Sequence, residues 1–170
     1  WQLQQVATLE RLASGRMNLG AHCWQSADAS LCGGQQRLMP QPSLDWRLEN
    51  FPLASLQPWL PEDFAWQGRL DGQLKVELPD SGPNGQITLD AGGGNLRIRQ
   101  ADDEQWLDFP YDSLRLSSTL RPQRVDSQLR FVSARLGELA LQAQIDPRPA
   151  HKPVSGEFRL SGFDLAVLRP

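Results

Sequence analysis

The sequence predicts an all-β protein in which an elongated, strongly curved sheet of antiparallel type folds into an open half-pipe, a groove with one or two short helices. Apolar and polar residues alternate with a period of two over most of residues 64–160. Turn signals rich in Gly, Pro, Asn and Asp recur every eight to twelve residues, and very few segments have helical spacing. Because so little helix is expected to cover the apolar face, the sheet must curve on itself.

The first residues of the chain fit two structures. Trp1 and Leu3 suggest a strand, whereas Val6, Leu9 and Leu12 would suit a helix equally well. The sequence leaves both interpretations open.

Cys23 and Cys32 are the two cysteines of the chain, and the small and polar residues between them suit a hairpin closed by a disulfide. Closing so short a ring would stabilise the fold by about 2–3 kcal/mol in the chain-entropy model, and it would imply an oxidising compartment. The alternative is a pair of reduced, partly buried thiols in a cytosolic protein. A zinc site with His22 and His151 would lack the paired short spacings of structural zinc sites, so we expect no metal site.

Two segments of the chain repeat each other. Residues 43–58 read SLDWRLENFPLASLQP and residues 155–170 read SGEFRLSGFDLAVLRP, with eight identical positions at an offset of 112 residues. One full period therefore covers residues 43–154, and the next begins at 155–170. Because a repeat buries its open face against its neighbour, we expect residues 1–170 to be a single fragment of a longer repetitive β-groove.

Leu53, Leu56 and Leu60 have helical spacing between Pro52 and Pro61. They predict a short helix of about two turns, because Pro is tolerated at a helix start and distorts or ends a helix further along. The repeat predicts the same element from Phe163.

The alternating apolar positions are the candidate lining of the groove. Period two places them on one face of each strand, with charged and polar residues on the other. If about a dozen strands stack at about 4.8 Å each, the sheet runs for about 55–60 Å. The candidate lining residues are Trp46, Leu48, Phe64, Trp66, Leu70, Leu74, Val76, Ile87, Leu89, Leu96, Ile98, Leu114, Leu116, Leu129, Phe131, Leu139, Leu141, Ile145, Phe158 and Leu160.

Composition argues against two function classes. The chain has two histidines, and it contains no nucleophile elbow, phosphate loop or HExxH motif, so we expect neither an enzyme nor a cofactor. The net charge is −3 and the basic residues are scattered along the chain. Because nucleic-acid binding needs a concentrated basic face, we expect no nucleic-acid partner.

Several segments together resemble the TamB family within the AsmA-like group. They are GRLDGQLKVEL at 68–78, GQITLD at 85–90 and NLRI at 95–98, preceded by FPLASLQPWLP at 51–61 and CWQSADASLC at 23–32. The resemblance spans nearly the whole chain, and it consists of a recurring residue pattern rather than a catalytic signature.

The resemblance implies a periplasmic segment of a protein that is anchored in the inner membrane of a Gram-negative bacterium and reaches TamA, a barrel in the outer membrane. It also implies a β-taco-like groove that shields phospholipid acyl chains in transit, and roles in outer-membrane biogenesis and autotransporter assembly. It brings no catalytic residue.

Three functions remain open at this point. The groove could be a lipid conduit, or a chaperone-like scaffold that binds strands of outer-membrane proteins by β-augmentation. The third interpretation is a closed β-sandwich spacer with a filled core.

Overall fold

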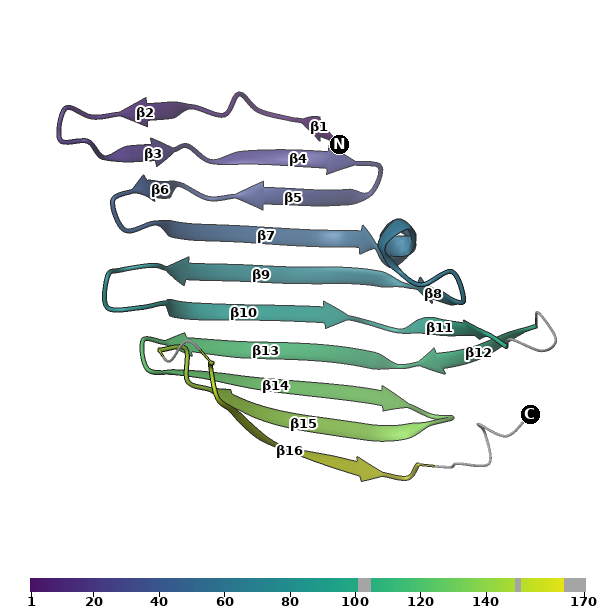
Figure 1. Cartoon of the computed structure of the whole chain (residues 1–170). Helices are drawn as coiled ribbons and strands as arrows, with labels where there is room; N and C mark the ends of the chain where they lie inside the picture. Colours follow the sequence, from purple (N-terminus) through teal and green to yellow (C-terminus); the bar gives the residue numbers. More distant parts are fainter. Residues whose placement is uncertain (101–104, 149–150, 164–170) are drawn as a thin grey trace.

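The computed structural model describes residues 1–100, 105–148 and 151–163, and strands make up 64% of the chain. One large sheet of thirteen strands and one small sheet of three strands account for all of them (Figure 1). The strands are β1 (Gln2–Leu3), β2 (Leu9–Arg11), β3 (Met17–Leu19), β4 (His22–Ser26), β5 (Ala29–Gly33), β6 (Gln36–Met39), β7 (Ser43–Pro52), β8 (Phe64–Gln67), β9 (Arg69–Glu77), β10 (Asn84–Ala91), β11 (Gly94–Arg99), β12 (Trp106–Tyr111), β13 (Ser113–Arg121), β14 (Arg124–Ser133), β15 (Gly137–Ile145) and β16 (Val154–Ser161).

The large sheet is an open antiparallel meander. Its strand order is β1-β4-β5-β7-β9-β10-β13-β14-β15-β16, and every neighbouring pair is antiparallel. Among the described residues β1 and β16 do not pair, so the sheet is not closed into a barrel. The predicted fold class, an open curved sheet, is confirmed.

The stack is shorter than the dozen strands expected, because several strands continue others end to end. β2 follows β1, β3 precedes β4, and β6 follows β5, so each pair occupies one level of the stack (Figure 1). The ten levels span about 43 Å at the usual strand spacing of about 4.8 Å. Residues 1–16 contain two short strands rather than a helix, and Trp1 stacks on Phe51 with ring centroids 6.4 Å apart.

The small sheet, of order β12-β11-β8, continues three strands of the large sheet beyond a break in each. β8 joins β9 through Gly68, which has a φ of +138°. A Cβ at Gly68 would lie 3.0 Å from Tyr111 Oη and 3.3 Å from Gly94 Cα, so both the backbone angle and the close approach require glycine there. A glycine inside a strand pattern commonly marks such an interruption.

The described helix, η1 (Leu53–Trp59), is a 3₁₀ helix that follows β7, as the spacing predicts. Leu53, the first residue of η1, forms a buried cluster with Ala91 and Tyr111. Tyr111 Oη accepts a hydrogen bond of 2.9 Å from Trp66 Nε1. Burial raises the pKa of the Tyr111 hydroxyl. The partly buried residues packed against this cluster are Leu56, Trp66, Leu70, Leu96, Leu114 and Phe131. We call this region the packed corner. The second helix expected from Phe163 falls in residues 164–170, outside the described residues.

The accessible surface shows how little of the chain is enclosed. It measures 11528 Å², whereas a compact monomer of 19.0 kDa exposes about 8,400 Å² by the usual scaling with mass. The excess argues against the closed sandwich with a filled core.

Candidate functional site

An unbroken row of side chains crosses the whole large sheet on one face. Cross-strand partners point to the same face of a sheet, so the register alone defines the row, one residue from each strand of the ten-strand path. We call it the central row. Its members are Leu3, Trp24, Leu31, Leu48, Gly72, Leu89, Leu116, Leu129, Leu141 and Phe158.

Gly72 is the one member of the central row without an apolar side chain. A Cβ placed there would lie 3.0 Å from Leu89 Cδ2 and 3.7 Å from Leu48 Cβ, so its neighbours in the row already flank the gap. The row is therefore apolar from β1 to β16.

Parallel rows flank the central row on the same face. The corner-side row contains Phe51, Leu70, Ala91, Leu114, Phe131, Leu139 and Leu160. The turn-side row contains Trp46, Leu74, Ile87, Ser118, Ser127, Ala143 and Gly156. Beyond it, the rim row contains Leu44, Val76, Gly85, Leu120, Val125, Ile145 and Val154.

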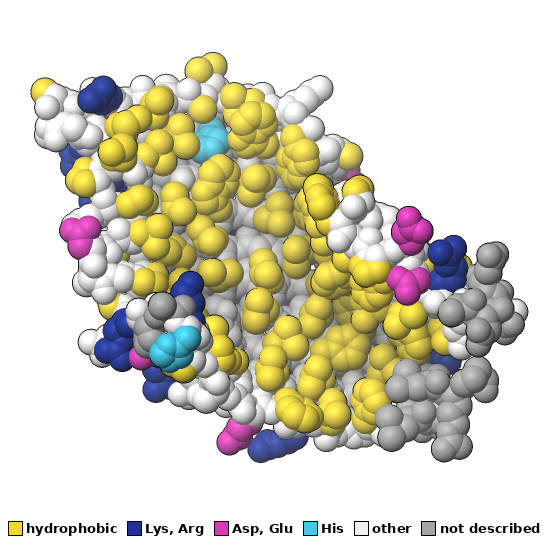
Figure 2. All heavy atoms as spheres, viewed as in Figure 1, with side chains coloured by type: hydrophobic (Ala, Val, Ile, Leu, Met, Phe, Trp, Pro, Cys, Tyr) yellow, Lys and Arg dark blue, Asp and Glu magenta, His cyan; other side chains and the backbone are white. Residues whose placement is uncertain are grey.

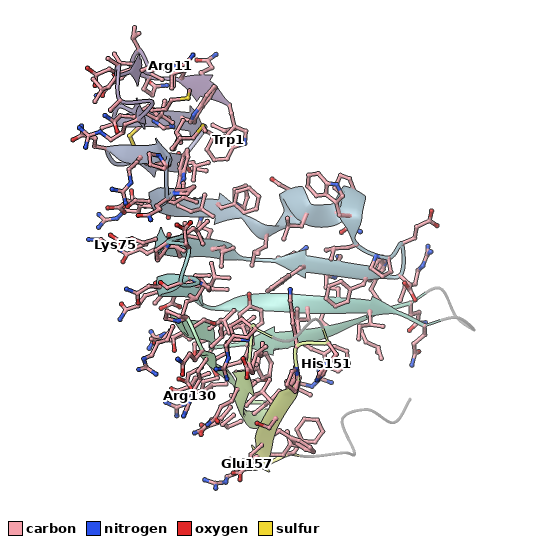
Figure 3. The ribbon with its side chains drawn as sticks, turned by 60° about the vertical axis from the view of Figure 1, so that its left-hand side comes forward. Trp1, Arg11, Lys75, Arg130, His151 and Glu157 are labelled. Atoms are coloured by element: carbon pink, nitrogen blue, oxygen red, sulfur yellow. A yellow bond between two sulfur atoms is a disulfide. The ribbon has the colours of Figure 1, made fainter. Side chains whose placement is uncertain are left out.

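This apolar face is open over the C-terminal strands. Figure 2 looks onto it and shows apolar side chains spread across the large sheet. The exposed fractions of Leu141, Phe158 and Leu160 are 38%, 71% and 48%. In Figure 3 Lys75 and Arg130 extend from the opposite side of the ribbon, and His151, in the β15–β16 turn, lies on the apolar side. The sheet thus curves towards its apolar face at this end.

All twenty predicted lining residues lie on this face, sixteen on the large sheet and four on the small one. Phe64 pairs with Ile98 and Trp66 with Leu96 on the small sheet. Not all twenty are open to a ligand, however. Val76 is buried, and the packed corner takes up Trp66, Leu70, Leu96, Leu114 and Phe131.

The candidate list omits the N-terminal part of the face. Leu3, Trp24 and Leu31 belong to the central row although their strands contain five residues or fewer. The alternation of Cys23-Trp24 and Leu31-Cys32 around a turn was the available signal. It is too short to establish a period of two by itself.

Two polar features interrupt the apolar face. Ser118 Oγ and Ser127 Oγ are hydrogen-bonded at 2.8 Å in the turn-side row. His22 is 4% exposed, its Nδ1 lies 2.9 Å from the Gly20 carbonyl oxygen, and its ring meets Trp46 edge-on. In both features the polar side chains form hydrogen bonds within the face, and neither feature is an ion pair.

Comparison with known families identifies the chain. The family model described as TamB, N-terminal domain, matches residues 1–170. The chain belongs to the TamB family. Membership confirms the resemblance and supports a TamB-related role in the bacterial envelope. No solved structure matches the chain.

The opposite face of this TamB-family chain is polar and ion-paired. Arg115 Nε and Asp90 Oδ2 are 2.8 Å apart, as are Arg130 Nε and Glu138 Oε1. The hydrogen bond from Arg130 lowers the pKa of the Glu138 carboxyl. A hollow of about 850 Å³ is lined by central-row residues together with their neighbours along each strand, whose side chains have the polar parity. Most of these neighbours are charged or polar, and they include the Arg115–Asp90 ion pair.

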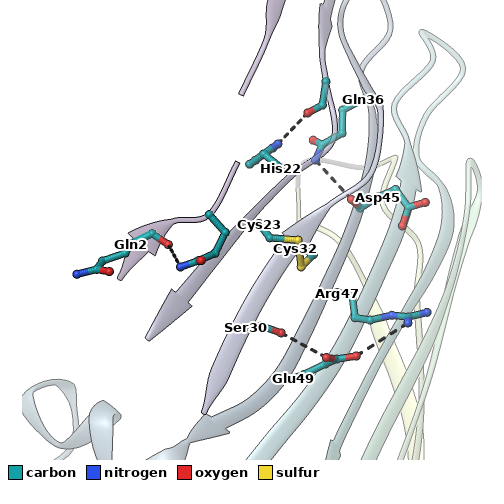
Figure 4. Close-up of a disulfide and its surroundings, with 11 residues drawn as sticks. Gln2, His22, Cys23, Ser30, Cys32, Gln36, Asp45, Arg47 and Glu49 are labelled. Atoms are coloured by element: carbon teal, nitrogen blue, oxygen red, sulfur yellow. Dashed lines mark hydrogen bonds and ion pairs between the residues drawn. A yellow bond between two sulfur atoms is a disulfide. The ribbon is translucent and has the colours of Figure 1, made fainter. Parts of the chain in front are cut away.

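The predicted disulfide is present in the TamB-family chain. Cys23 and Cys32 lie directly opposite each other on β4 and β5, with their sulfur atoms 2.12 Å apart (Figure 4). Their side chains alternate with those of His22 and Trp24, so the bond lies on the polar face. The disulfide therefore fixes the hairpin from outside and leaves the apolar face clear.

Among the residues that the structure describes, no group of three or more His, Cys, Asp and Glu side chains is placed to hold a metal ion. No helix in residues 1–100, 105–148 or 151–163 is long and apolar enough to cross a membrane.

Proposed function

We propose that the apolar face of this chain shields phospholipid acyl chains during transit between the membranes of the bacterial envelope. The central row carries the proposal, because it offers an apolar track across ten strands and no other part of the described chain covers its C-terminal half. Membership in the TamB family supports the setting.

The energetics favour such a track. Each buried CH₂ group is worth about 0.8 kcal/mol, so an acyl chain of about sixteen carbons costs about 13 kcal/mol to bring into water. A continuous apolar surface removes most of this cost at every step. Its members are mainly leucines, which make non-directional contacts, and such a surface permits sliding rather than tight capture at one place.

The proposed setting follows the family resemblance. The segment would lie in the periplasm, within a protein anchored in the inner membrane and linked to a TamA-type outer-membrane barrel. Its transport would serve outer-membrane biogenesis and autotransporter assembly.

The experiment is to purify the chain from Gram-negative cells and identify bound lipid by mass spectrometry. The parent should carry phospholipid. Leu116→Glu and Leu141→Glu should lose it, because an acyl chain cannot satisfy a charge. Ser117→Glu and Gln142→Glu place the same charge one residue away, on the polar face, and should retain it. A parent free of lipid, or equal loss in both sets, would contradict the proposal.

A second function is supported by a different observation. Every residue of β16 is exposed, and within the part of the chain that the structure describes β16 pairs with β15 alone. Such an edge suits a scaffold that receives strands of outer-membrane proteins by β-augmentation. Main-chain protection of β16 against amide exchange by a client strand, without lipid displacement, would favour this alternative.

A further inference from the structure

The two long edges of the open face differ in what borders them. On one side, the packed corner and the small sheet occupy the ends of β9, β10 and β13. On the other side lie the hairpin turns, and exposure in the rim row differs along the sheet, since Val76 is buried whereas Val154 is 66% exposed. A lipid whose tails lie on the central row can therefore keep its headgroup in water most readily along the turn side.

The turn side is not uniformly charged. The β9–β10 turn is bordered by Glu77 and contains Asp80, and it has no basic residue. The β13–β14 and β15–β16 turns carry a basic cluster, and Figure 2 shows basic side chains around the histidine at this edge. We call this cluster the basic rim. Its members are Arg121, Arg124, Arg148 and Lys152.

The basic rim adjoins the apolar face directly. Arg121 pairs with Arg124 in the register, and the next pair on the inward face is Leu120 with Val125. Ile145 pairs with Val154 immediately before the β15–β16 turn. Arg121 and Arg124 have the parity of the polar face and are the last residues before the turn, so they border the edge of the sheet one residue from the apolar rim row.

The carboxylates of this edge do not use all the cationic donors. Asp126 binds Arg121 Nη1 at 2.9 Å and Arg124 Nε at 2.5 Å, and Asp146 binds Arg148 through Nε and Nη2. A guanidinium has five N–H donors, so Arg121 and Arg124 retain donors for another acceptor. Two carboxylates face four cations, and among the described residues no carboxylate lies within 4 Å of Lys152.

We infer that the basic rim is a headgroup site for anionic phospholipid, in which Arg121, Arg124 and Lys152 contact the lipid phosphate while the acyl chains lie on the rim and central rows. The inference rests on the proposed function and adds the chemical class of lipid. Charge complementarity at an apolar edge selects this occupant over a zwitterionic lipid of the same chain length.

The test uses short-chain phosphatidylglycerol and phosphatidylcholine with identical acyl chains, below their micelle concentrations, titrated into the 170-residue chain by calorimetry. The parent should prefer phosphatidylglycerol by at least about fivefold, since each basic residue near an anionic headgroup contributes about that factor. The preference should weaken between about 10 mM and 150 mM salt, as the Debye length falls from about 30 Å to about 8 Å.

The variants separate this inference from the proposed function. Arg124→Gln/Lys152→Gln should lose most of the preference and bind phosphatidylcholine as the parent does. The control Arg47→Gln/Lys75→Gln removes the same charge from the polar face and should keep the preference.

Equal affinity of the parent for both lipids, or equal loss in the control, would overturn the headgroup site and leave the apolar groove standing. Competition by inorganic phosphate as strong as by phosphatidylglycerol would also overturn it, because the site would then bind a free anion. If neither lipid binds the parent, the proposed function fails together with the inference.

Discussion

The packed corner and the open face share strands and apolar side chains, but they differ in what covers those side chains. In the corner Leu53 of η1 is completely buried in the cluster with Ala91 and Tyr111, against which the small sheet also packs. On the open face Leu141 and Phe158 point from the same side of the same sheet and remain exposed. The comparison separates two uses of one alternating pattern, since the corner gives the fold its core and the face remains available to a ligand.

The largest expected difference between the two regions is in stability. Leu53→Ala should lower the free energy of unfolding by about 2–5 kcal/mol, because it deletes a fully buried leucine side chain. Leu116→Ala should cost about 1 kcal/mol or less, since its side chain lies on the partly exposed central row. Urea denaturation followed by tryptophan fluorescence measures both. Equal losses would mean that the open face is packed like a core.

Removing the disulfide should cost about 2–3 kcal/mol, because it closes a ring of only about ten residues. The effect of Cys23→Ser/Cys32→Ser should be confined to the N-terminal strands, since the bond joins β4 to β5 on the polar face. Amide hydrogen exchange should show faster opening of β4 and β5, with β14 and β15 unchanged. Accelerated exchange throughout the large sheet would show instead that the hairpin supports the open face.

A charged substitution in each region tests whether that region is packed or open. Leu70→Glu should unfold or strongly destabilise the chain, because Leu70 packs against the buried cluster. Leu141→Glu should change the melting temperature by only a few degrees, because its side chain is 38% exposed. Thermal melts of the two variants provide the measurement. Unfolding by Leu141→Glu would place this leucine in a filled core.

The smallest expected effect concerns the basic rim. Hydrogen bonds from the Arg148 side chain and backbone lower the pKa of the Asp146 carboxyl to about 2. A carboxyl with a lowered pKa stabilises the folded turn above its unfolded value of about 3.9, and this contribution is lost as the pH falls through about 2. An NMR titration of the Asp146 carboxyl should have its midpoint near 2. Arg148→Gln should raise the midpoint towards the ordinary pKa of an aspartate. An ordinary midpoint in the parent would contradict the Asp146–Arg148 ion pair.

The sequence predicts the face better than it predicts the corner. Period two fixes the side of the sheet for residues such as Leu116 and Leu129, because alternation and strand geometry have the same period. It gives no sign that Leu70 and Leu96 are covered while Leu141 is open. That difference depends on the breaks at Gly68 and near Gly92, beyond which three strands form the small sheet, and on the packing of distant residues around Leu53.

The N-terminal strands were hardest to predict, because their alternation is too short to establish a period. Leu3 joins the central row only through its pairing with Trp24. The basic rim is not predictable from the sequence for a related reason. Arg121 and Lys152 are far apart in the sequence, and the topology alone brings their turns to the same edge of the sheet.

The central claim is that one face of the sheet contacts acyl chains and the other does not. Photo-crosslinking from adjacent positions tests it most directly, because neighbouring residues of a strand point to opposite faces. A crosslinker at Leu116, Leu129 or Leu141 in the full-length protein in cells should capture phospholipid, and one at Ser117, Gln128 or Gln142 should not. Equal capture from both members of each pair, or capture from neither, would contradict the account.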